Sequence, residues 1–193
     1  MQRSDIIQAA AHIFREKGYH AASMQDIADA VQLQKASLYH HVSSKQEILL
    51  AILDQALDLL ISDMRNVVDT DLSPAEKLRS AMQVYIGRLT EDPNLAAVLL
   101  LEYRSLEPRL QTRHIARRDR YESLWRQVVH DGITSGDFRP VDEQIVTYAL
   151  LGVQNWLITW FKEGGRLSAL EVADHFSDLF LRGLKAEGAE WPS

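Results

Sequence analysis

Apolar residues recur at helical spacing along almost the whole chain, and no stretch shows the strict alternation that is typical of a strand. Near the beginning, one apolar stripe is made of Ile6, Ile7, Ala10, Ala11 and Phe14. Gly18 follows this stripe, and glycine readily takes the left-handed conformation in which many helices end. The spacing therefore predicts a first helix that ends at about residue 17.

Two short helices joined by a tight turn are predicted for residues 23–41. Ser23 can cap the first of them, with Asp26 at the third helical position. The second helix, residues 35–41, exposes polar side chains and gives only Leu38 to the core. Because core helices are rarely so polar, the pattern is typical of a helix-turn-helix whose second helix enters the major groove of DNA.

The rest of the chain is also predicted to be helical, and most of its helices open on a capping residue or a proline. Helices are expected to open at Ser44, Ser73, Pro93, Arg109, Asp142 or Glu143, and Ser168. Pro108 is expected to end the helix that Pro93 begins, and the helix from Asp142 or Glu143 is expected to continue to Lys162. The predicted fold class is therefore all-α.

Five short motifs follow one another in the first quarter of the chain. They are Ile7 to Phe14, Gly18-Tyr19, Asp26-Ile27-Ala28, Leu38-Tyr39-His40-His41-Val42 and Ser44-Lys45-Gln46-Glu47. Together they resemble the TetR family of bacterial transcriptional regulators, over about residues 3–55. The resemblance implies a three-helix helix-turn-helix DNA-binding domain at residues 1–48. It implies a helical domain for ligand binding and dimerisation at residues 49–193.

The resemblance also implies which side chains meet DNA. It places Lys35, Ala36, Ser37, Tyr39 and His40 on the recognition helix, and Gln25, Tyr39 and Lys45 near phosphates. As isolated residues, Tyr39 and His40 would fit an ordinary surface equally well, but the order of all the signals favours DNA binding.

Three positions depart from the commonest pattern of the family. Gln32 stands where the turn usually has glycine, Ala36 where the second helix has glycine, and Val42 where phenylalanine is usual. Gln32 must therefore form a tight turn without glycine. Ala36 changes which base edges can be approached, so the operator sequence cannot be carried over from the family.

Composition neither supports nor contradicts DNA binding. The 193-residue chain has a net charge of −6, and residues 1–50 hold five basic and five acidic side chains. Without a broad positive field, attraction to phosphates must come from a few placed cations and helix N-termini, which favours specific binding over non-specific coating.

Three further features of the chain indicate where the protein works. It has no cysteine, and its first residues do not form a signal sequence. Its longest strongly apolar run, Leu95–Leu101, is far shorter than the roughly 20 residues that span a bilayer. We therefore expect a cytoplasmic protein with no membrane partner.

The predicted helix around residues 149–161 is apolar on nearly every side and so needs partners on every side. Its own domain can cover one face, and dimerisation would bury the other. The family resemblance implies the same, with two terminal helices packed against their copies in a four-helix bundle. The predicted dimer contacts are Gly152, Val153, Phe176, Leu179 and Phe180. The alternative is that these residues belong to the core of a monomer.

Large aromatic and methionine side chains are frequent in the C-terminal part: Met82, Tyr85, Tyr103, Trp125, Phe138, Tyr148, Trp156 and Trp160. Such residues more often form plain core than a binding site. The family resemblance implies a ligand cavity between the helices of this domain, and rigid aromatic rings would supply its walls. We predict that all of them except Phe138 line an effector site, together with Arg104.

Arginines are dense between Arg104 and Arg126, and Arg109, Arg113 and Arg117 share one helix face. Because like charges repel, an anionic group must neutralise this stripe. Acids of a neighbouring helix are the more common partners of such a face. The alternative is that the arginines bind phosphate groups of a ligand, which suits the planar guanidinium fork.

The segment Asn155–Phe161, followed by Gly164–Ser168, resembles the branch of the TetR family that senses acyl-coenzyme A thioesters. The acyl chain would then lie among the aromatic residues and the coenzyme phosphates against arginines. We predict a homodimeric, ligand-responsive repressor that binds a palindromic operator and is released by a small molecule, with an acyl-CoA thioester as one candidate.

Two other functions on the same fold are left open. One is a regulator of efflux that senses drugs or hydrophobic compounds, and the other is an architectural or cell-division DNA-binding protein without a ligand. Catalysis is not expected, because no His-Glu-x-x-His, phosphate-binding glycine loop or nucleophile elbow occurs. The seven histidines are scattered without metal-ligand spacing, so neither a metal nor a cofactor is expected.

Overall fold

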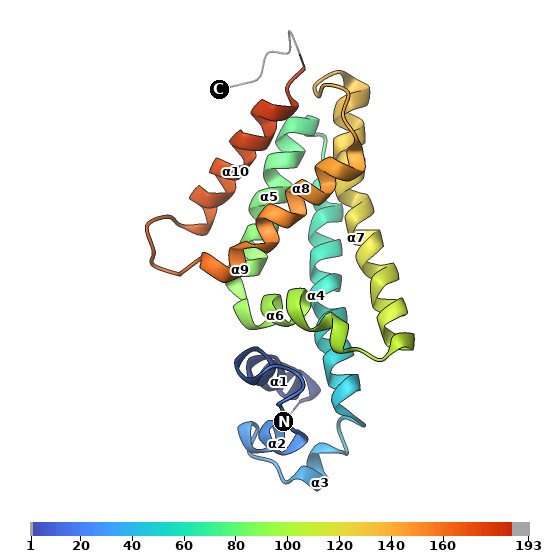
Figure 1. Cartoon of the computed structure of the whole chain (residues 1–193), viewed down its shortest axis with the longest axis vertical. Helices are drawn as coiled ribbons and strands as arrows, with labels where there is room; N and C mark the ends of the chain where they lie inside the picture. The colour runs from blue at the N-terminus through green and yellow to red at the C-terminus, as the bar shows by residue number, and fades with distance from the viewer. Residues whose placement is uncertain (1, 187–193) are drawn as a thin grey trace. The chain divides into compact units, whose positions relative to one another are not determined.

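The computed structural model describes residues 2–186, which are α-helical without any β-strand (Figure 1). In chain order the helices are α1 (Arg3–Lys17), α2 (Met24–Ala30), α3 (Lys35–Leu38), α4 (Lys45–Val68), α5 (Pro74–Glu91), α6 (Pro93–Ala97), α7 (Pro108–Ser135), α8 (Glu143–Asn155), α9 (Leu157–Trp160) and α10 (Ala169–Leu184). The predicted all-α fold is confirmed. Within the described part of the chain, no helix is long and apolar enough to cross a membrane.

The described residues form two compact units. Unit 1 contains the residues up to Leu59 together with Asp92–Arg118, and unit 2 contains Leu60–Glu91 and the residues from Asp119 onward. Helices α4 and α7 are each continuous and contribute residues to both units. The three N-terminal helices therefore share unit 1 with the segment from α6 to the first turns of α7. The functional division between residues 48 and 49 stays a prediction.

Unit 1 is built around the apolar stripe of α1, which packs against α2 and α6. Ile6, Ala10 and Phe14 are almost completely buried, as their spacing predicted. Helix α1 ends at Gly18, whose φ of 77° suits a residue without a Cβ atom. In α3 only Leu38 is buried, so the rest of this short helix is free for another surface.

The turn between α2 and α3 ends the first of these helices in a Schellman motif. The Leu33 N–H donates to the carbonyl of Ala28 at 2.9 Å, and the Gln32 N–H donates to that of Asp29 at 3.1 Å. Gln32 has a φ of 54°, and it is the one residue other than glycine with a positive φ in the described part of the chain. The expectation of a tight turn without glycine at this position is confirmed.

We expect Gln32→Gly to raise the free energy of unfolding by about 0.5–1 kcal/mol. The left-handed conformation costs a residue with a Cβ atom about 1–2 kcal/mol, and glycine removes this strain. The greater conformational freedom of glycine in the unfolded chain offsets part of the resulting stabilisation. Urea unfolding of the purified protein measures the change. The matched control is Gln8→Gly, at an exposed position inside α1, which should lower the free energy by about 0.5–1 kcal/mol. A destabilised Gln32→Gly variant would contradict the argument.

The connection from α6 to α7 differs from the single helix predicted between Pro93 and Pro108. Asp92 caps α6, but the helix then widens into a π-helical turn, Val98–Glu102, and tightens into a 3₁₀ turn, Tyr103–Ser105. Pro108 does not end a helix and is instead the first residue of α7. Proline fits this position because its fixed φ is already helical and its missing N–H would have no partner there.

The long helix predicted from Asp142 or Glu143 to Lys162 is also interrupted. Helix α8 ends at Asn155, and the short helix α9 follows from Leu157. At the break, the carbonyl of Trp156 accepts both the backbone N–H and the hydroxyl of Thr159, at 3.1 and 2.7 Å. A hydroxyl that bonds the nearby backbone competes with the regular helical pattern, which accounts for the tightened turn.

Unit 2 is organised by α5 and α10, which pack along each other (Figure 1). The predicted stripe of α5 from Leu78 to Leu89 is buried. The Arg79 guanidinium pairs with Asp178 at 2.6 Å, and the Gln83 amide donates to Asp174 at 2.9 Å, which fixes the register of the two helices. Capping boxes open α10 at Ser168 and α5 at Ser73, as predicted.

The C-terminal end of α7 is closed by an aromatic ring. Phe138 is 1% exposed, and a Cβ atom on Gly132 would lie 2.2 Å from its ring. Only glycine leaves room for this packing. Phe138 therefore belongs to the core of unit 2, the more common role of such residues.

Candidate DNA-binding and effector sites

Helix α3 offers a polar surface held from below by one apolar anchor. Lys35 and His40 are exposed and Tyr39 is 47% exposed, whereas Leu38 is completely buried. The α-helix ends at Leu38, earlier than predicted, and residues 39–41 continue as a turn. The predicted base-reading residues therefore project from one short helix and the turn that follows it, with Ala36 exposed and Ser37 half-buried between them.

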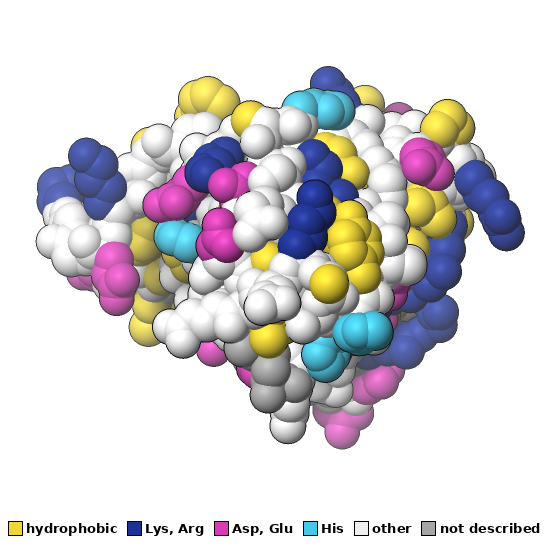
Figure 2. Space-filling model, turned by 90° about the horizontal axis from the view of Figure 1, so that it is seen from below, with side chains coloured by type: hydrophobic (Ala, Val, Ile, Leu, Met, Phe, Trp, Pro, Cys, Tyr) yellow, Lys and Arg dark blue, Asp and Glu magenta, His cyan; other side chains and the backbone are white. Residues whose placement is uncertain are grey.

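Figure 2 shows the molecule from below, the side on which α3 lies in Figure 1. Lysine, arginine and histidine side chains are scattered there among polar and apolar ones, with acidic groups between them. This face does not carry a continuous basic field. The view agrees with the neutral balance of residues 1–50 and favours a few placed contacts to phosphates.

Two of the predicted phosphate contacts lie outside α3. Gln25 is exposed on α2, and its amide donates to Asp29 at 2.7 Å. The Lys45 ammonium donates to the carbonyls of Tyr19 and Ala22 at 2.8 and 2.7 Å and lies 4.4 Å from the centre of the Tyr19 ring. Lys45 therefore holds the loop between α1 and α2, a role that the sequence did not indicate. Its contact with phosphate stays a prediction.

The start of α2 is fixed by the predicted capping box. The Ser23 hydroxyl accepts the Asp26 N–H at 3.1 Å, and the Asp26 carboxylate accepts the Ser23 N–H at 2.8 Å. Lys17 also donates to Asp26, at 2.7 Å. The hydrogen bonds from Lys17 and then from Ser23 hold the pKa of Asp26 far below its usual range. The carboxylate is therefore ionised at neutral pH and ties the end of α1 to the beginning of α2.

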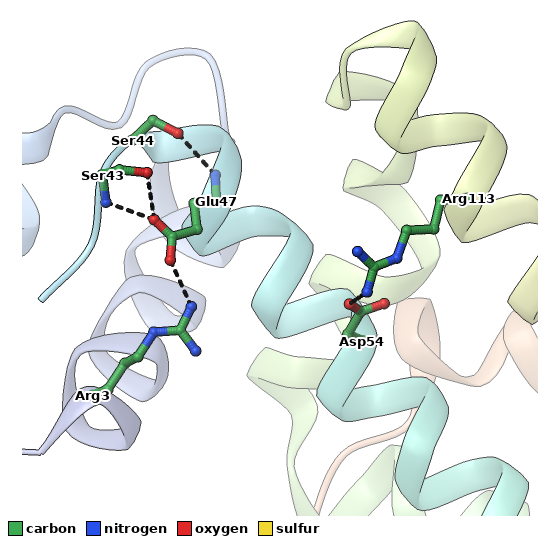
Figure 3. Close-up of polar contacts among 6 residues, drawn as sticks. All are labelled: Arg3, Ser43, Ser44, Glu47, Asp54 and Arg113. Carbon is green, nitrogen blue, oxygen red and sulfur yellow. Dashed lines mark hydrogen bonds and ion pairs between the residues drawn. The ribbon is translucent and has the colours of Figure 1, made fainter.

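The start of α4 is fixed in a slightly different way from the predicted capping box (Figure 3). The Ser44 hydroxyl accepts the Glu47 N–H at 3.1 Å, but the Glu47 carboxylate turns back to the backbone and hydroxyl of Ser43, each at 2.6 Å. These two bonds lower the pKa of Glu47. Arg3 completes the cluster with an ion pair of 2.8 Å, which ties α1 to α4.

The arginine stripe of α7 is paired in part with acids of α4. Arg113 lies 3.1 Å from Asp54, as Figure 3 shows, and Arg117 contacts both Asp54, at 3.3 Å, and Asp58. For Arg113 and Arg117 the more common alternative is therefore confirmed, because these two charges are neutralised by a neighbouring helix. They form a seam between α4 and α7 within unit 1.

A second cationic cluster in unit 1 surrounds Tyr103. The rings of Tyr103 and His114 stack with centroids 5.9 Å apart, and the guanidinium carbons of Arg104 and Arg118 lie 5.6 and 5.7 Å from the Tyr103 centroid. The hydrogen bond from Arg104 lowers the pKa of the Tyr103 phenol. His114 is 1% exposed, and burial followed by the charge of Arg118 lowers its pKa, so its ring is neutral at pH 7.

The aromatic residues predicted to line one effector site do not form one group. In unit 2, Tyr85 and Trp125 lie together with Tyr121, which the prediction omitted, at centroid distances of 5.8 to 6.4 Å. Met82 is buried on the same helix face as Tyr85. Tyr103 and Arg104 belong to unit 1.

Polar groups are buried in this aromatic cluster. The Tyr85 hydroxyl donates to Asn155, and burial raises the pKa of Tyr85. The indole N–H of Trp125 has no acceptor in good hydrogen-bond geometry, although it interacts with the Tyr121 hydroxyl, and on α8 the Oε1 atom of Gln154 is buried without a donor. Buried polar atoms are rarely left unpaired in folded proteins, so these two atoms need an explanation.

Three residues of the predicted effector site are exposed instead of lining a cavity. Tyr148, Trp156 and Trp160 are 48%, 66% and 43% exposed. Their spacing placed them on a helix but could not show which face the rest of the chain covers. Helix α8 buries only Thr147, Leu150 and Gln154, so its own chain covers one face of the helix, as expected, and leaves the other face exposed.

The residues predicted to form the dimer lie where the chain leaves apolar surface. Leu179 is 67% exposed and Val153 is 36% exposed, while Phe176 and Phe180 are half-buried. Gly152 is exposed, and a Cβ atom there would have no neighbour within 4 Å. The structure thus leaves apolar groups of α8 and α10 at the surface of unit 2. That a second copy covers them stays a prediction.

Two family models match the chain. The model of bacterial regulatory proteins of the tetR family matches residues 6–52, and that of the tetracyclin repressor-like C-terminal domain matches residues 71–184. The protein belongs to the TetR family. The resemblance read from the N-terminal motifs is confirmed, and it extends to the helices of the C-terminal part.

Characterised members of the TetR family match this chain over nearly its whole length. The transcriptional repressor KstR2 of Mycobacterium tuberculosis is 28% identical over 189 residues, which are 97% of this chain and 94% of the relative. The fatty acid metabolism regulator protein of Bacillus subtilis is 24% identical, with 93% of each chain covered. The first of these relatives is named as a transcriptional repressor and the second as a regulator of fatty acid metabolism.

Solved structures of the TetR family show the same fold. PfmR of Thermus thermophilus is 39% identical with a TM-score of 0.86, covering 93% of this chain and 98% of that one. AibR in complex with isovaleryl coenzyme A and operator DNA is 29% identical, also with a TM-score of 0.86, covering 93% and 97%. The described helices are therefore arranged as in known TetR regulators.

Proposed function

We propose that the protein is a dimeric repressor that binds a palindromic operator and is released by an acyl-coenzyme A thioester. The observation that carries the proposal is the similarity over nearly the whole chain to AibR, whose structure contains both isovaleryl coenzyme A and operator DNA. Two other relatives, KstR2 and the fatty acid metabolism regulator of Bacillus subtilis, are also regulators. We place its action in the cytoplasm, where an operator is accessible.

The aromatic cluster of unit 2 supports an acyl group as the apolar part of the effector. Rings of Tyr85, Tyr121 and Trp125 offer rigid apolar walls. The indole N–H of Trp125 would gain a well-aligned acceptor from the thioester carbonyl. A hydrocarbon without such a carbonyl would leave that N–H with only its poorly aligned contact to the Tyr121 hydroxyl.

The arginine stripe of α7 is a poor candidate for holding the coenzyme phosphates. Arg113 and Arg117 already face Asp54 and Asp58, and an anion would have to compete with these carboxylates.

We call the helix-turn-helix formed by α2 and α3 the reading head. Release of DNA requires only that the thioester binds more tightly to a dimer whose two reading heads do not fit the operator. Recognition helices of a dimeric helix-turn-helix protein read half-sites about one helical turn, roughly 34 Å, apart. A complete reversal from bound to free would need a preference of about 5.5 kcal/mol. The regulator then responds to the concentration of the thioester.

The test is a panel of acyl-CoA thioesters, free acids and neutral hydrophobic compounds, each added to the protein on DNA selected from a random library. We expect a thioester, but not its free acid, to release DNA. The same thioester should stabilise the DNA-free protein, by about 2.7 kcal/mol at a hundredfold excess over Kd.

Trp125→Phe tests the buried contact directly, because it removes the indole N–H and keeps an aromatic ring. We expect at least about tenfold weaker thioester binding, the effect of losing one hydrogen bond to a buried donor. Trp160→Phe is the matched control, since Trp160 is exposed, and should bind the thioester as before. Release of DNA by a neutral hydrophobic compound and by no thioester would instead identify a drug-sensing regulator.

A further inference from the structure

The side chain of Gln46 joins three parts of unit 1. Its Nε2 group donates to the Tyr19 hydroxyl at 2.9 Å and to the Ser105 carbonyl at 2.8 Å. Its Oε1 atom accepts the Glu107 N–H at 3.0 Å. Both ends of the amide are therefore engaged, and all three partners lie outside α4.

These bonds connect the beginnings of two long helices. Gln46 is the second residue of α4, and Glu107 immediately precedes α7, whose first residue is Pro108. Both helices continue from unit 1 into unit 2. Gln46 therefore fastens the first turns of the two helices to each other and, through Tyr19, to the loop between α1 and α2.

Glu102 makes a second connection to the same loop. Its carboxylate accepts the Tyr19 N–H at 3.1 Å and the Ser105 hydroxyl at 3.1 Å. The Ser105 hydroxyl also lies 3.2 Å from Nε2 of His20. The loop that leads into α2 is thus held by the segment that joins the π-helical turn to α7.

Farther along the two helices, the contact continues as ion pairs. Asp54 of α4 meets Arg113 and Arg117 of α7. If α4 moved along α7, these ion pairs would have to break or re-form. The same movement would also strain the hydrogen bonds of Gln46. The 3₁₀ and π-helical turns beside Gln46 are backbone forms that can change their hydrogen-bond register over a few residues.

We infer that Gln46 is a positioning residue that transmits effector binding to the DNA-reading head. The part that concerns the effector rests on the proposed function. Gln46 does not belong to the residues assigned to DNA. Its bonds make the position of the loop before α2 depend on the relative position of α4 and α7, so that a shift between these helices moves the helix-turn-helix.

A first experiment needs no effector. If the segment 102–107 is coupled to the reading head, binding of operator DNA should slow amide hydrogen exchange in this segment of the unaltered protein by at least about tenfold. In Gln46→Ala the slowing should disappear. Gln55→Ala, on an exposed position of the same helix, should behave like the unaltered protein.

A second experiment measures coupling itself. The operator affinity of each variant is determined without and with saturating isovaleryl coenzyme A, or with the panel thioester that releases DNA most strongly. Gln46→Ala should keep its operator affinity without thioester within about threefold, and the factor by which the thioester weakens that affinity should fall at least about tenfold. Thioester affinity in the absence of DNA should be unchanged.

Gln46→Glu is the second variant. It keeps the size of the side chain and an acceptor for Glu107, but it cannot donate to the Ser105 carbonyl, so it should show the same loss if the alanine variant fails to fold. Exchange and coupling equal to those of the unaltered protein would overturn the inference. So would loss of operator affinity in a folded variant, because Gln46 would then serve DNA binding itself. If no thioester releases DNA from the unaltered protein, the proposed effector fails, and the exchange experiment still decides the role of Gln46.

Discussion

A variant carrying both Tyr39→Ala and His40→Ala is expected to lose specific operator binding and to keep its fold. Neither side chain supports the core, which α3 reaches through Leu38 alone. A good contact to a base edge contributes about 1–3 kcal/mol of discrimination. A dimer would lose two side chains at each of two half-sites, so the operator affinity should fall by at least about a thousandfold.

Fluorescence anisotropy with labelled operator, at one fixed salt concentration, measures this loss. Circular dichroism and the unfolding midpoint should be unchanged. His41→Ala is the matched control, because His41 is an exposed neighbour outside the predicted set. Operator affinity within about threefold of that of the unaltered protein would remove α3 as the recognition helix.

Leu179→Asp is expected to convert the dimer into monomers. Leu179 is 67% exposed on α10, in the surface that we assign to a second copy. Burial of one leucine side chain contributes about 1.5–3 kcal/mol, and two-fold symmetry removes that contribution twice. The introduced carboxylate adds repulsion from its own copy across the axis.

Sedimentation at micromolar concentration should show a dimer for the unaltered protein and a monomer for Leu179→Asp. Because a monomer reads only one half-site, operator binding should fall together with the dimer. Leu72→Asp provides the comparison, since Leu72 is 41% exposed in the loop before α5 and should leave the mass unchanged. A monomeric unaltered protein would refute the dimer and, with it, the palindrome.

The reading head could be predicted from the sequence because its signals are local. The cap at Ser23, the anchor Leu38 and the glycine at residue 18 each act within a few positions of the chain. The strained turn at Gln32 was expected for another reason, because the family that the sequence resembles usually has glycine at this position. Such features depend little on what the rest of the chain does.

The effector residues could not be predicted in the same way. Spacing places Trp125 and Trp156 on helical faces, but only the neighbouring helices decide that one is buried and the other is 66% exposed. The partner of Arg113 is Asp54, 59 positions earlier in the chain. The bonds of Gln46 span 27 to 61 positions, and no local sequence pattern predicts them.

The π-helical turn Val98–Glu102 is a place where the chain can lose one residue. A π turn holds one residue more than an α turn, so a deletion there would allow a regular α-helix to form. Because the removed residue is the surplus one, the chain that follows would keep nearly the same orientation around the helix axis, and Tyr103 would still face His114. The loop between α9 and α10 can change in length by more than one residue at its exposed glycine, Gly164. In related chains of other lengths, single-residue deletions should therefore be found at the π-helical turn, and longer insertions and deletions near residue 164.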